Sequence, residues 1–347
     1  MYRKLAAILL SLVLVFALFA CGNETPAPDA SEAAAPAASV DVQKDTPEVD
    51  ASDLTIAFCI NNMSDAFPIT ILRGVQDACD EYGVNLVYQG PSTSDYTLQT
   101  PVLESMLNGS EADGLLIIPC GGDNMLQPVT EAIDKYDIPV ITMDIAFTDE
   151  SVFLAHVTSD NYAGGKLAAD ALDELIQASG SDSHKVAAIS SNPSSDTNVK
   201  RLSGWRDEIQ KLGYTVVSEQ WCNNDPSTAA SQTSSILLTF PDTAGFFGGN
   251  LFSSQGVINA LSSDDVDLPL VCFDAGQGQV EALRNKEVDA LIVQKPYLIG
   301  YTAATYMIEY LTRGTQPEQY TYLEPCIAYY DDLENPEINQ YFYDAVE

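Results

Sequence analysis

Two aspartates close apolar runs of strand length at corresponding places in the sequence. Asp144 ends the run DIPVITMD, and Asp274 ends the run DLPLVCFD. Two carboxylates that face one cleft suit glycoside hydrolysis, in which one acts as an acid and the other as a nucleophile or base. They equally suit ligand binding, in which ionised carboxylates accept hydrogen bonds from hydroxyl groups. A helix N-cap is a third interpretation of each aspartate, because caps commonly follow strands.

Both aspartates belong to an internal repeat. DIPVITMD starts at Asp137 and DLPLVCFD at Asp267, and TIAF at Thr55 precedes KVAA at Lys185 by the same interval (267 − 137 = 130). Apolar residues with helical spacing repeat at this interval too, at Leu72, Val75, Cys79 and Tyr82 and again at Leu202, Trp205, Ile209 and Leu212. An interval shared by several elements in the same order indicates two similar lobes in tandem.

Within each half, strand-length apolar runs alternate with stretches of helical period, which is typical of a parallel sheet with crossover helices. We therefore predict an α/β protein with two similar Rossmann-like lobes, the first over about 54–157 and the second over about 158–294. Ligands of open sheets bind beyond the carboxyl ends of the strands. Two such edges that face each other would form a ligand cleft, with one aspartate from each lobe.

The N-terminus has the pattern of an export signal. Arg3 and Lys4 precede an apolar or small stretch that continues to Ala20, somewhat short for a membrane span. The string LFAC resembles the lipobox of bacterial lipoproteins, which predicts a signal peptide over 1–20 and a lipid on Cys21; an ordinary signal with an incidental cysteine is the alternative. Residues 21–53 would then be the lipidated cysteine and a disordered tether, because Ala, Pro, Ser, Asp and Glu dominate there.

The composition argues against several kinds of partner. Fifty acidic residues against fifteen basic ones give a net charge of −35, whereas binding to nucleic acid needs clustered Lys and Arg. Two histidines, and no CxxC pair among the seven cysteines, predict no metal site, and we expect no cofactor. We expect the six cysteines after Cys21 to be buried thiols, with disulfides as the alternative.

Seven stretches carry a family resemblance: DAFPITILRGVQDAC (65–79), IPVITMD (138–144), HVTSDNYAGGKLAAD (156–170), KRLSGW (200–205), FFGGN (246–250), LVCFDAG (270–276) and IVQKPYLIGYTAA (292–304). Together they resemble the type I periplasmic binding proteins, in particular the ribose and galactose branch of ABC importer components. The resemblance implies a three-strand hinge near residues 158, 295 and 323. It also implies an N-terminal lobe of 54–157 plus 295–322 and a C-terminal lobe of 158–294 plus 323–347.

The resemblance further implies a set of ligand positions in this sequence: Phe67, Asp144, Arg201, Asn250, Asp274 and Gln294. Planar polar groups can hold adjacent hydroxyls in fixed geometry, and an aromatic ring can cover the CH face of a sugar. The alternatives are a core position for Phe67, a surface charge for Arg201, a turn for Asn250 and a hinge contact for Gln294. Trp221 is a weaker candidate, for which a core position is the alternative.

Four first-lobe positions depart from the pattern of sugar-binding relatives. Asp65, Pro68, Ile118 and Ile145 stand where those relatives often carry Asn, a second aromatic residue, Asn and Arg. Asp65 stays among the ligand candidates. Because isoleucines replace two polar groups, we expect a ligand with one polar edge and one less polar face, such as a modified or larger sugar, a deoxy compound or a nucleoside.

We therefore predict an extracytoplasmic solute-binding lipoprotein without enzymatic activity. It would bind a sugar or sugar-like molecule by hinge closure, act as a monomer, and deliver the ligand to the membrane subunits of an ABC permease. The lipid on Cys21 would hold it at the outer face of the cell membrane. The alternatives are a tethered sensor for a receptor kinase, a nucleoside-binding lipoprotein and a glycosidase.

Overall fold

The computed structural model describes residues 49–343. The predicted signal peptide, the lipid site at Cys21 and most of the predicted tether lie outside these residues. The described residues belong to one compact unit. The prediction of a disordered tether as far as residue 53 is wrong at its end, because Asp50 caps a short 3₁₀ helix, η1 (Ala51–Asp53). Within the described range, no helix is both long and apolar enough to span a membrane.

The first sheet contains six parallel strands in the order β11-β5-β4-β3-β1-β2. The strands are β1 (Thr55–Cys59), β2 (Asn85–Gln89), β3 (Gly114–Ile117), β4 (Val140–Met143), β5 (Ala155–Ser159) and β11 (Tyr320–Leu323). The helices that belong with it are α1 (Ala66–Tyr82), α2 (Tyr96–Ser110), α3 (Leu126–Tyr136) and α9 (Pro296–Arg313), with 3₁₀ helices η2 (Gly122–Met125) and η3 (Glu150–Val152).

The second sheet has the order β12-β10-β9-β8-β6-β7. Its strands are β6 (Lys185–Ser190), β7 (Thr215–Trp221), β8 (Gly245–Gly248), β9 (Leu270–Phe273), β10 (Ala290–Val293) and β12 (Cys326–Tyr329). Its helices are α4 (Asn161–Ser179), α5 (Asp196–Lys211), α6 (Pro226–Thr239), α7 (Leu251–Ser263), α8 (Gln277–Arg284) and α10 (Pro336–Asn339), with the 3₁₀ helix η4 (Tyr330–Asp332). Strand β12 runs antiparallel to β10, and the other pairs are parallel.

The two sheets confirm the prediction of two similar α/β lobes. Strands β1, β3 and β4 hold the same places in the first sheet as β6, β8 and β9 hold in the second. The chain passes between the lobes after β5, between β10 and α9, and between β11 and β12. Only Glu324 and Pro325 separate β11 from β12. With no crossover helix to return it to the starting edge, β12 enters the second sheet antiparallel.

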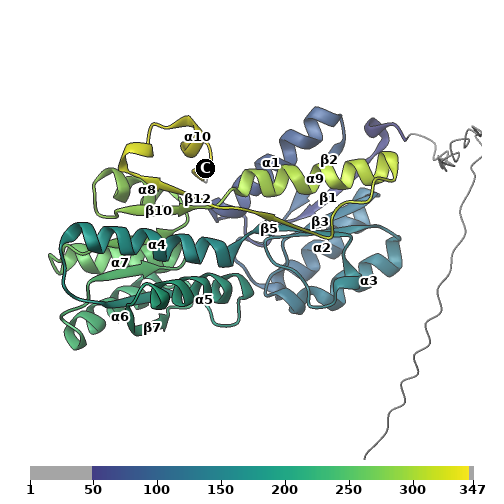
Figure 1. The fold of residues 1–347 in the computed structure, drawn as a ribbon. Helices are drawn as coiled ribbons and strands as arrows, with labels where there is room; N and C mark the ends of the chain where they lie inside the picture. The colour runs from purple at the N-terminus through teal and green to yellow at the C-terminus, as the bar shows by residue number, and fades with distance from the viewer. Residues whose placement is uncertain (1–48, 344–347) are drawn as a thin grey trace, which may run out of the picture. The chain divides into compact units, whose positions relative to one another are not determined.

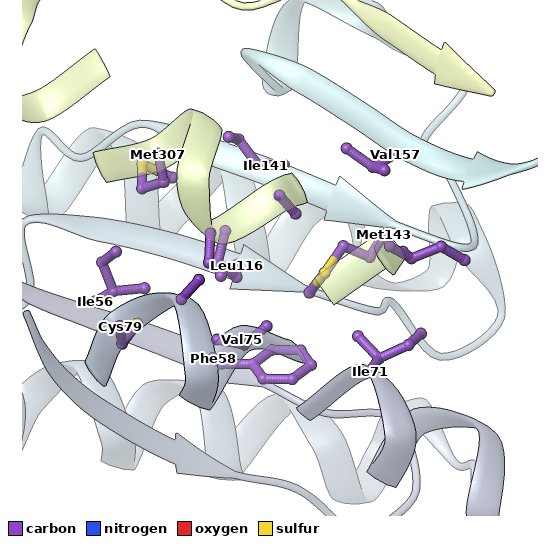
Figure 2. Close-up of a cluster of buried hydrophobic side chains, with 14 of the residues drawn as sticks. Ile56, Phe58, Ile71, Val75, Cys79, Leu116, Ile141, Met143, Val157 and Met307 are labelled. Atoms are coloured by element: carbon purple, nitrogen blue, oxygen red, sulfur yellow. The ribbon is translucent and has the colours of Figure 1, made fainter. Parts of the chain in front are cut away.

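The first sheet is buried on both faces, as parallel sheets with crossover helices usually are. Ile56 and Phe58 of β1 pack in the cluster under α1 and α9, whereas Ala57 and Cys59 pack in the cluster under α2 and α3. This alternation follows from the two-residue period of a strand. Figure 2 shows the first cluster, where Met307 of α9 lies over the same sheet as the side chains of α1.

The predicted helical stripes are buried, with one exception. Leu72, Val75 and Cys79 of α1 and Leu202, Trp205 and Ile209 of α5 are core residues, and Tyr82 packs against the core. The prediction for Leu212 is wrong, because this residue is the C-cap of α5 and is 37% exposed. All six cysteines after Cys21 are free thiols, as expected; five are buried and Cys326 is half-buried.

Glycines allow one pair of helices in each lobe to approach closely. A Cβ atom at Gly74 of α1 would lie 2.0 Å from a backbone oxygen of α9, and one at Gly300 of α9 would lie 2.0 Å from a backbone oxygen of α1. Figure 1 shows these two helices side by side. In the second lobe, a Cβ atom at Gly165 of α4 would lie 2.0 Å from the carbonyl oxygen of Arg201 in α5. This close approach brings Arg201 beside Asn161, the first residue of α4.

Candidate ligand-binding site

Several of the predicted side chains lie at the carboxyl ends of strands. Asp144 follows β4 and Asp274 follows β9, which hold the same position in the two sheets. Both aspartates adopt left-handed backbone conformations, with φ of 61° and 84°. Asp tolerates this region better than most residues because its short side chain can hydrogen-bond locally. Gln294 follows β10, the neighbour of β9.

Four groups of the protein hold the Asp274 carboxylate. Its Oδ1 atom accepts hydrogen bonds from the Tyr343 hydroxyl, at 2.7 Å, and from Nε2 of Gln294. Its Oδ2 atom accepts from the backbone N–H of Leu251, at 2.8 Å, and lies 3.7 Å from a terminal nitrogen of Arg201. Leu251 begins α7, so Asp274 caps a neighbouring helix rather than the one that follows it. Asp274 therefore combines a capping role with a buried ion pair.

Arg201 is a buried cation and not a surface charge. The residue is 5% exposed, although it lies on an otherwise amphipathic helix. Its Nε atom donates to Oδ1 of Asn161 at 2.7 Å, and a terminal nitrogen donates to the carbonyl of Gly249 at 3.2 Å. Its guanidinium carbon lies 3.9 Å from the centroid of the Phe273 ring. Stacking and directed donors together fix the plane of the guanidinium.

The start of α1 supplies the first lobe's contribution. Asp65 is the N-cap of this helix, and its Oδ1 atom accepts from the backbone N–H of Phe67 at 3.1 Å. The Phe67 ring is half-buried and packs against hydrophobic clusters of both lobes. It meets the Tyr343 ring edge to face, with centroids 5.6 Å apart. Since Tyr343 also bonds to Asp274, these contacts connect Asp65 to the second lobe.

Electrostatic interactions link Asp144 to charged groups of both lobes. Burial raises its pKa to about 6, the Arg201 guanidinium lowers it, and the like charges of Asp274 and Asp65 raise it. Burial also raises the pKa of Asp65, against the hydrogen bond from the Phe67 N–H, and the Asp274 charge adds to the rise. The N-cap interpretation fails for Asp144, because the next helix, η3, is capped by Asp149.

Asn250 is occupied by helix capping. Its Oδ1 atom accepts from the backbone N–H of Ser253 at 3.0 Å, and its own N–H donates to the Ser253 hydroxyl at 3.0 Å. Its Nδ2 atom donates to Asn224 at 2.9 Å. Asn250 follows Gly249, whose carbonyl accepts a hydrogen bond from Arg201. It is therefore next in sequence to a contact of the charged cluster, which we define as Asp65, Asp144, Arg201 and Asp274. The structure shows its side chain as a cap rather than as part of a plain turn.

Two other predicted positions do not join the charged cluster. Trp221 ends β7 at the sheet edge, is half-buried and packs against the core under α4 and α5. In residues 49–343, no hydrogen bond or ring contact connects it to Asp274 or Arg201. Ile118 has no exposed surface and belongs to the first-lobe core. The expectation that Ile118 gives the ligand site a less polar face is therefore wrong. Ile145 is half-buried.

The sequence argument missed Tyr343 and Asn161. Tyr343 is 5% exposed, bonds to Asp274 and donates its backbone N–H to the carbonyl of Ala275 at 3.0 Å. It follows a short irregular segment, where no periodic pattern marks a buried side chain. Asn161 lies within a stretch that carried the family resemblance, but only the packing of α4 on α5 reveals that it holds Arg201.

The described residues contain no group of three or more His, Cys, Asp or Glu residues placed to hold a metal ion. A surface hollow of about 580 Å³ lies apart from the charged cluster, beside α6 and the edge strand β7. Its lining is mainly Ser, Thr and Gln: Ser218, Gln220, Ser227, Thr228, Ser231, Gln232, Ser235, Ile236, Thr239 and Phe240.

Comparison with known families places most of the chain in one of them. The family model described as "Periplasmic binding protein domain" matches residues 56–316. Among curated proteins, the chain is 28% identical over 247 residues to the ribose import binding protein RbsB of Haemophilus influenzae, covering 71% of this chain and 82% of that protein. It is 24% identical over 301 residues to RbsB of Bacillus subtilis, covering 87% and 91%.

A solved structure agrees with the sequence matches. An ABC transporter solute-binding protein from Agrobacterium vitis, bound with alpha-D-tagatopyranose, superposes with a TM-score of 0.77 at 29% identity. The match covers 84% of this chain and 100% of that protein.

Proposed function

This chain belongs to the periplasmic binding protein domain family, and from that premise we propose that it is an extracytoplasmic solute-binding protein that binds a sugar for an ABC importer. Its partners would be a sugar and the membrane subunits of a permease, and it would act as a monomer without catalysis. The names of its relatives, which include ribose import binding proteins, support this assignment.

The observation that carries the proposal is the pair of charged strand ends, with Asp144 after β4 in one sheet and Asp274, paired with Arg201, after β9 at the same place in the other. Asp144 interacts electrostatically with Asp65 of its own lobe and with Arg201 and Asp274 of the other. Ionised groups of this kind form charge-assisted hydrogen bonds with hydroxyls. We propose the ligand-binding residues to be Asp65, Phe67, Asp144, Arg201, Asn250, Asp274 and Gln294, with Trp221 as a weaker candidate.

The topology supports a hinge mechanism. The chain crosses between the lobes three times, and the proposed ligand groups lie on both sides of the crossings. We propose lobes of 54–157 plus 295–322 and of 158–294 plus 323–347. A ligand that contacts both lobes binds the closed form more tightly than the open form, and this difference in affinity stabilises the closed form. The permease would receive the closed form with its ligand.

A catalytic role is less consistent with the contacts. A glycosidase needs one carboxylate free to donate a proton and another free to attack or activate water. Asp274 already accepts from Leu251, Gln294 and Tyr343 and lies beside Arg201. Asp274 is therefore not free to act as the acid or the nucleophile, and the named relatives are binding proteins. We propose binding without turnover, and incubation of any bound disaccharide with the protein should release no product.

A thermal-shift screen tests the proposed function. The purified protein is heated with D-ribose, D-arabinose, D-galactose, D-tagatose and a set of nucleosides. A ligand at a hundredfold excess over its Kd raises the free energy of unfolding by about 2.7 kcal/mol, which corresponds to a rise in Tm of several degrees. We expect such a rise with at least one sugar. No change with any sugar at millimolar concentration contradicts the proposal.

Cys21 is proposed to carry a lipid that anchors the protein to the membrane. Replacing it with serine in the full chain should move the protein from the membrane fraction to the soluble fraction, because stable anchoring depends on acyl chains. Ser31→Ala, in the same segment, serves as the matched control and should stay with the membrane. Fractionation followed by immunoblotting measures both. Retention of the Cys21→Ser protein on membranes would refute the anchor.

A further inference from the structure

The charged cluster contains more acid than base. Asp65, Asp144 and Asp274 supply three carboxylates, whereas Arg201 is the one cation that interacts with Asp144. Asp274 lies 3.7 Å from that guanidinium and forms its ion pair. Asp65 and Asp144, both on the first-lobe side, have no comparable partner among residues 49–343. A neutral sugar would leave this excess negative charge uncompensated in a largely buried site, which is unfavourable.

The hydrogen bonds show the same imbalance. No described residue donates a hydrogen bond to the Asp144 carboxylate, and the Asp65 carboxylate receives only the N–H of Phe67. Gln294 is 1% exposed, and its Oε1 atom has no partner while its Nε2 atom donates to Asp274. An ionised carboxylate can only accept, so this surface needs a ligand with several donors. An ammonium group offers three donors and a positive charge.

Several of the nearby donors are already used. The Tyr343 hydroxyl and the Gln294 amide nitrogen both donate to Asp274, and Nε of Arg201 donates to Asn161. No group of three acidic, His or Cys side chains in the described part of the chain is placed to hold a metal ion. A hydroxylated organic cation needs fewer carboxylates, because its ammonium charge can meet one or two of them while its hydroxyls reach the other polar groups.

We propose that the site selects a hydroxylated amine, in the first place an amino sugar, whose ammonium group binds Asp65 and Asp144. The hydroxyls of the same ligand would face Gln294 and the pair of Arg201 with Asp274. This inference rests on the proposed function and narrows its ligand class. The raised pKa values of Asp65 and Asp144 agree with it, because a bound cation would favour the ionised form of both carboxylates.

Isothermal titration at pH 7 tests the inference with matched sugars. D-galactosamine, D-glucosamine and D-mannosamine are each compared with the neutral parent sugar and with the N-acetyl derivative, which has no charge. We expect at least one amine to bind at least tenfold more tightly than its parent and its N-acetyl derivative. The preference should shrink as salt rises, because screening weakens the attraction.

Asp65→Asn separates charge recognition from helix capping, since Asn is as good an N-cap as Asp. The variant should fold, and the preference for the amine over its neutral parent should fall to about threefold or less. Asp95→Asn is the matched control: Asp95 caps α2 by accepting from the Thr97 N–H at 2.8 Å. This control should keep the full preference.

Three results overturn the inference, and they differ in what they mean for the proposed function. Binding of neutral sugars without any gain for the amines overturns the amine assignment and leaves the sugar-binding function standing. Failure of every sugar, neutral or charged, to bind overturns both. An unchanged amine preference in Asp65→Asn also overturns it, because the proposed partner of the ammonium group would then be wrong.

Discussion

Replacing Asp274 with asparagine should weaken ligand binding by at least about a hundredfold. The carboxylate accepts from the Tyr343 hydroxyl, the Gln294 amide and the Leu251 N–H, and it pairs with Arg201. An amide of the same shape loses the charge and turns an NH₂ group toward other donors. Removing one charge from a buried, hydrogen-bonded binding site typically costs about 2–5 kcal/mol of binding free energy, and a hundredfold change in Kd is about 2.8 kcal/mol.

Calorimetric titration with the best ligand from the screen measures this change, and melting temperatures separate lost binding from lost folding. Asp289→Asn is the matched control. Asp289 is an exposed residue of the same lobe whose carboxylate accepts from the backbone N–H of Leu270 at 2.9 Å, at the other end of the strands. The Asp289→Asn protein should lose some stability and keep its affinity for the ligand. Wild-type affinity in a folded Asp274→Asn protein would exclude Asp274 from the site.

Replacing Asp144 with asparagine should stabilise the ligand-free protein at neutral pH while weakening ligand binding at least tenfold. The folded-state pKa of Asp144 is raised from 3.8 to about 6, so the ionised carboxylate is less favourable in the fold than in the unfolded chain. A shift of this size corresponds to at most about 3 kcal/mol, and partial exposure reduces it to about 1–2 kcal/mol.

The pH dependence of the Asp144→Asn effect has a definite sign. Above pH 6 the wild type carries the full cost of the ionised group. As the pH falls from about 6 to about 4, the folded wild type takes up a proton that the unfolded chain has not yet bound, so the difference in stability between wild type and variant should close. Denaturant unfolding between pH 4 and pH 8 measures it.

Asp137→Asn is the control for this comparison. Asp137 is exposed, lies in the same lobe and has a left-handed backbone with φ of 53°, so asparagine affects its conformation in a similar way. Because the side chain is exposed, its substitution should change stability only slightly. A stability difference between wild type and Asp144→Asn that stays constant from pH 4 to pH 8 contradicts the electrostatic account of Asp144.

The repeat in the sequence was sufficient to predict the fold. Strand runs such as DIPVITMD and DLPLVCFD occupy matching places in the two sheets, because a parallel sheet buried on both faces demands apolar strands. The same reasoning placed Asp144 and Asp274 at corresponding strand ends. The antiparallel direction of β12 was not predictable from the repeat, since this strand lies outside it.

The site was less predictable than the fold, because its contacts depend on packing between distant segments. Arg201 looks like a surface residue on an amphipathic helix, and only the close approach of α4 at Gly165 buries it beside Asn161. Tyr343 reaches Asp274 from near the end of the chain, where no periodicity marks it. The buried stripe of α5 ends at Ile209 and does not include Leu212, because the helix stops at Lys211.

A crystal structure of the protein with the tightest ligand from the screen tests the central claim most directly. The account predicts one ligand in contact with both lobes, within hydrogen-bonding distance of Asp144 and of the group formed by Arg201, Asp274 and Gln294. A ligand bound in the hollow between β7 and α6, beside Ser218 and Gln232, with Asp144 and Asp274 untouched, would contradict it.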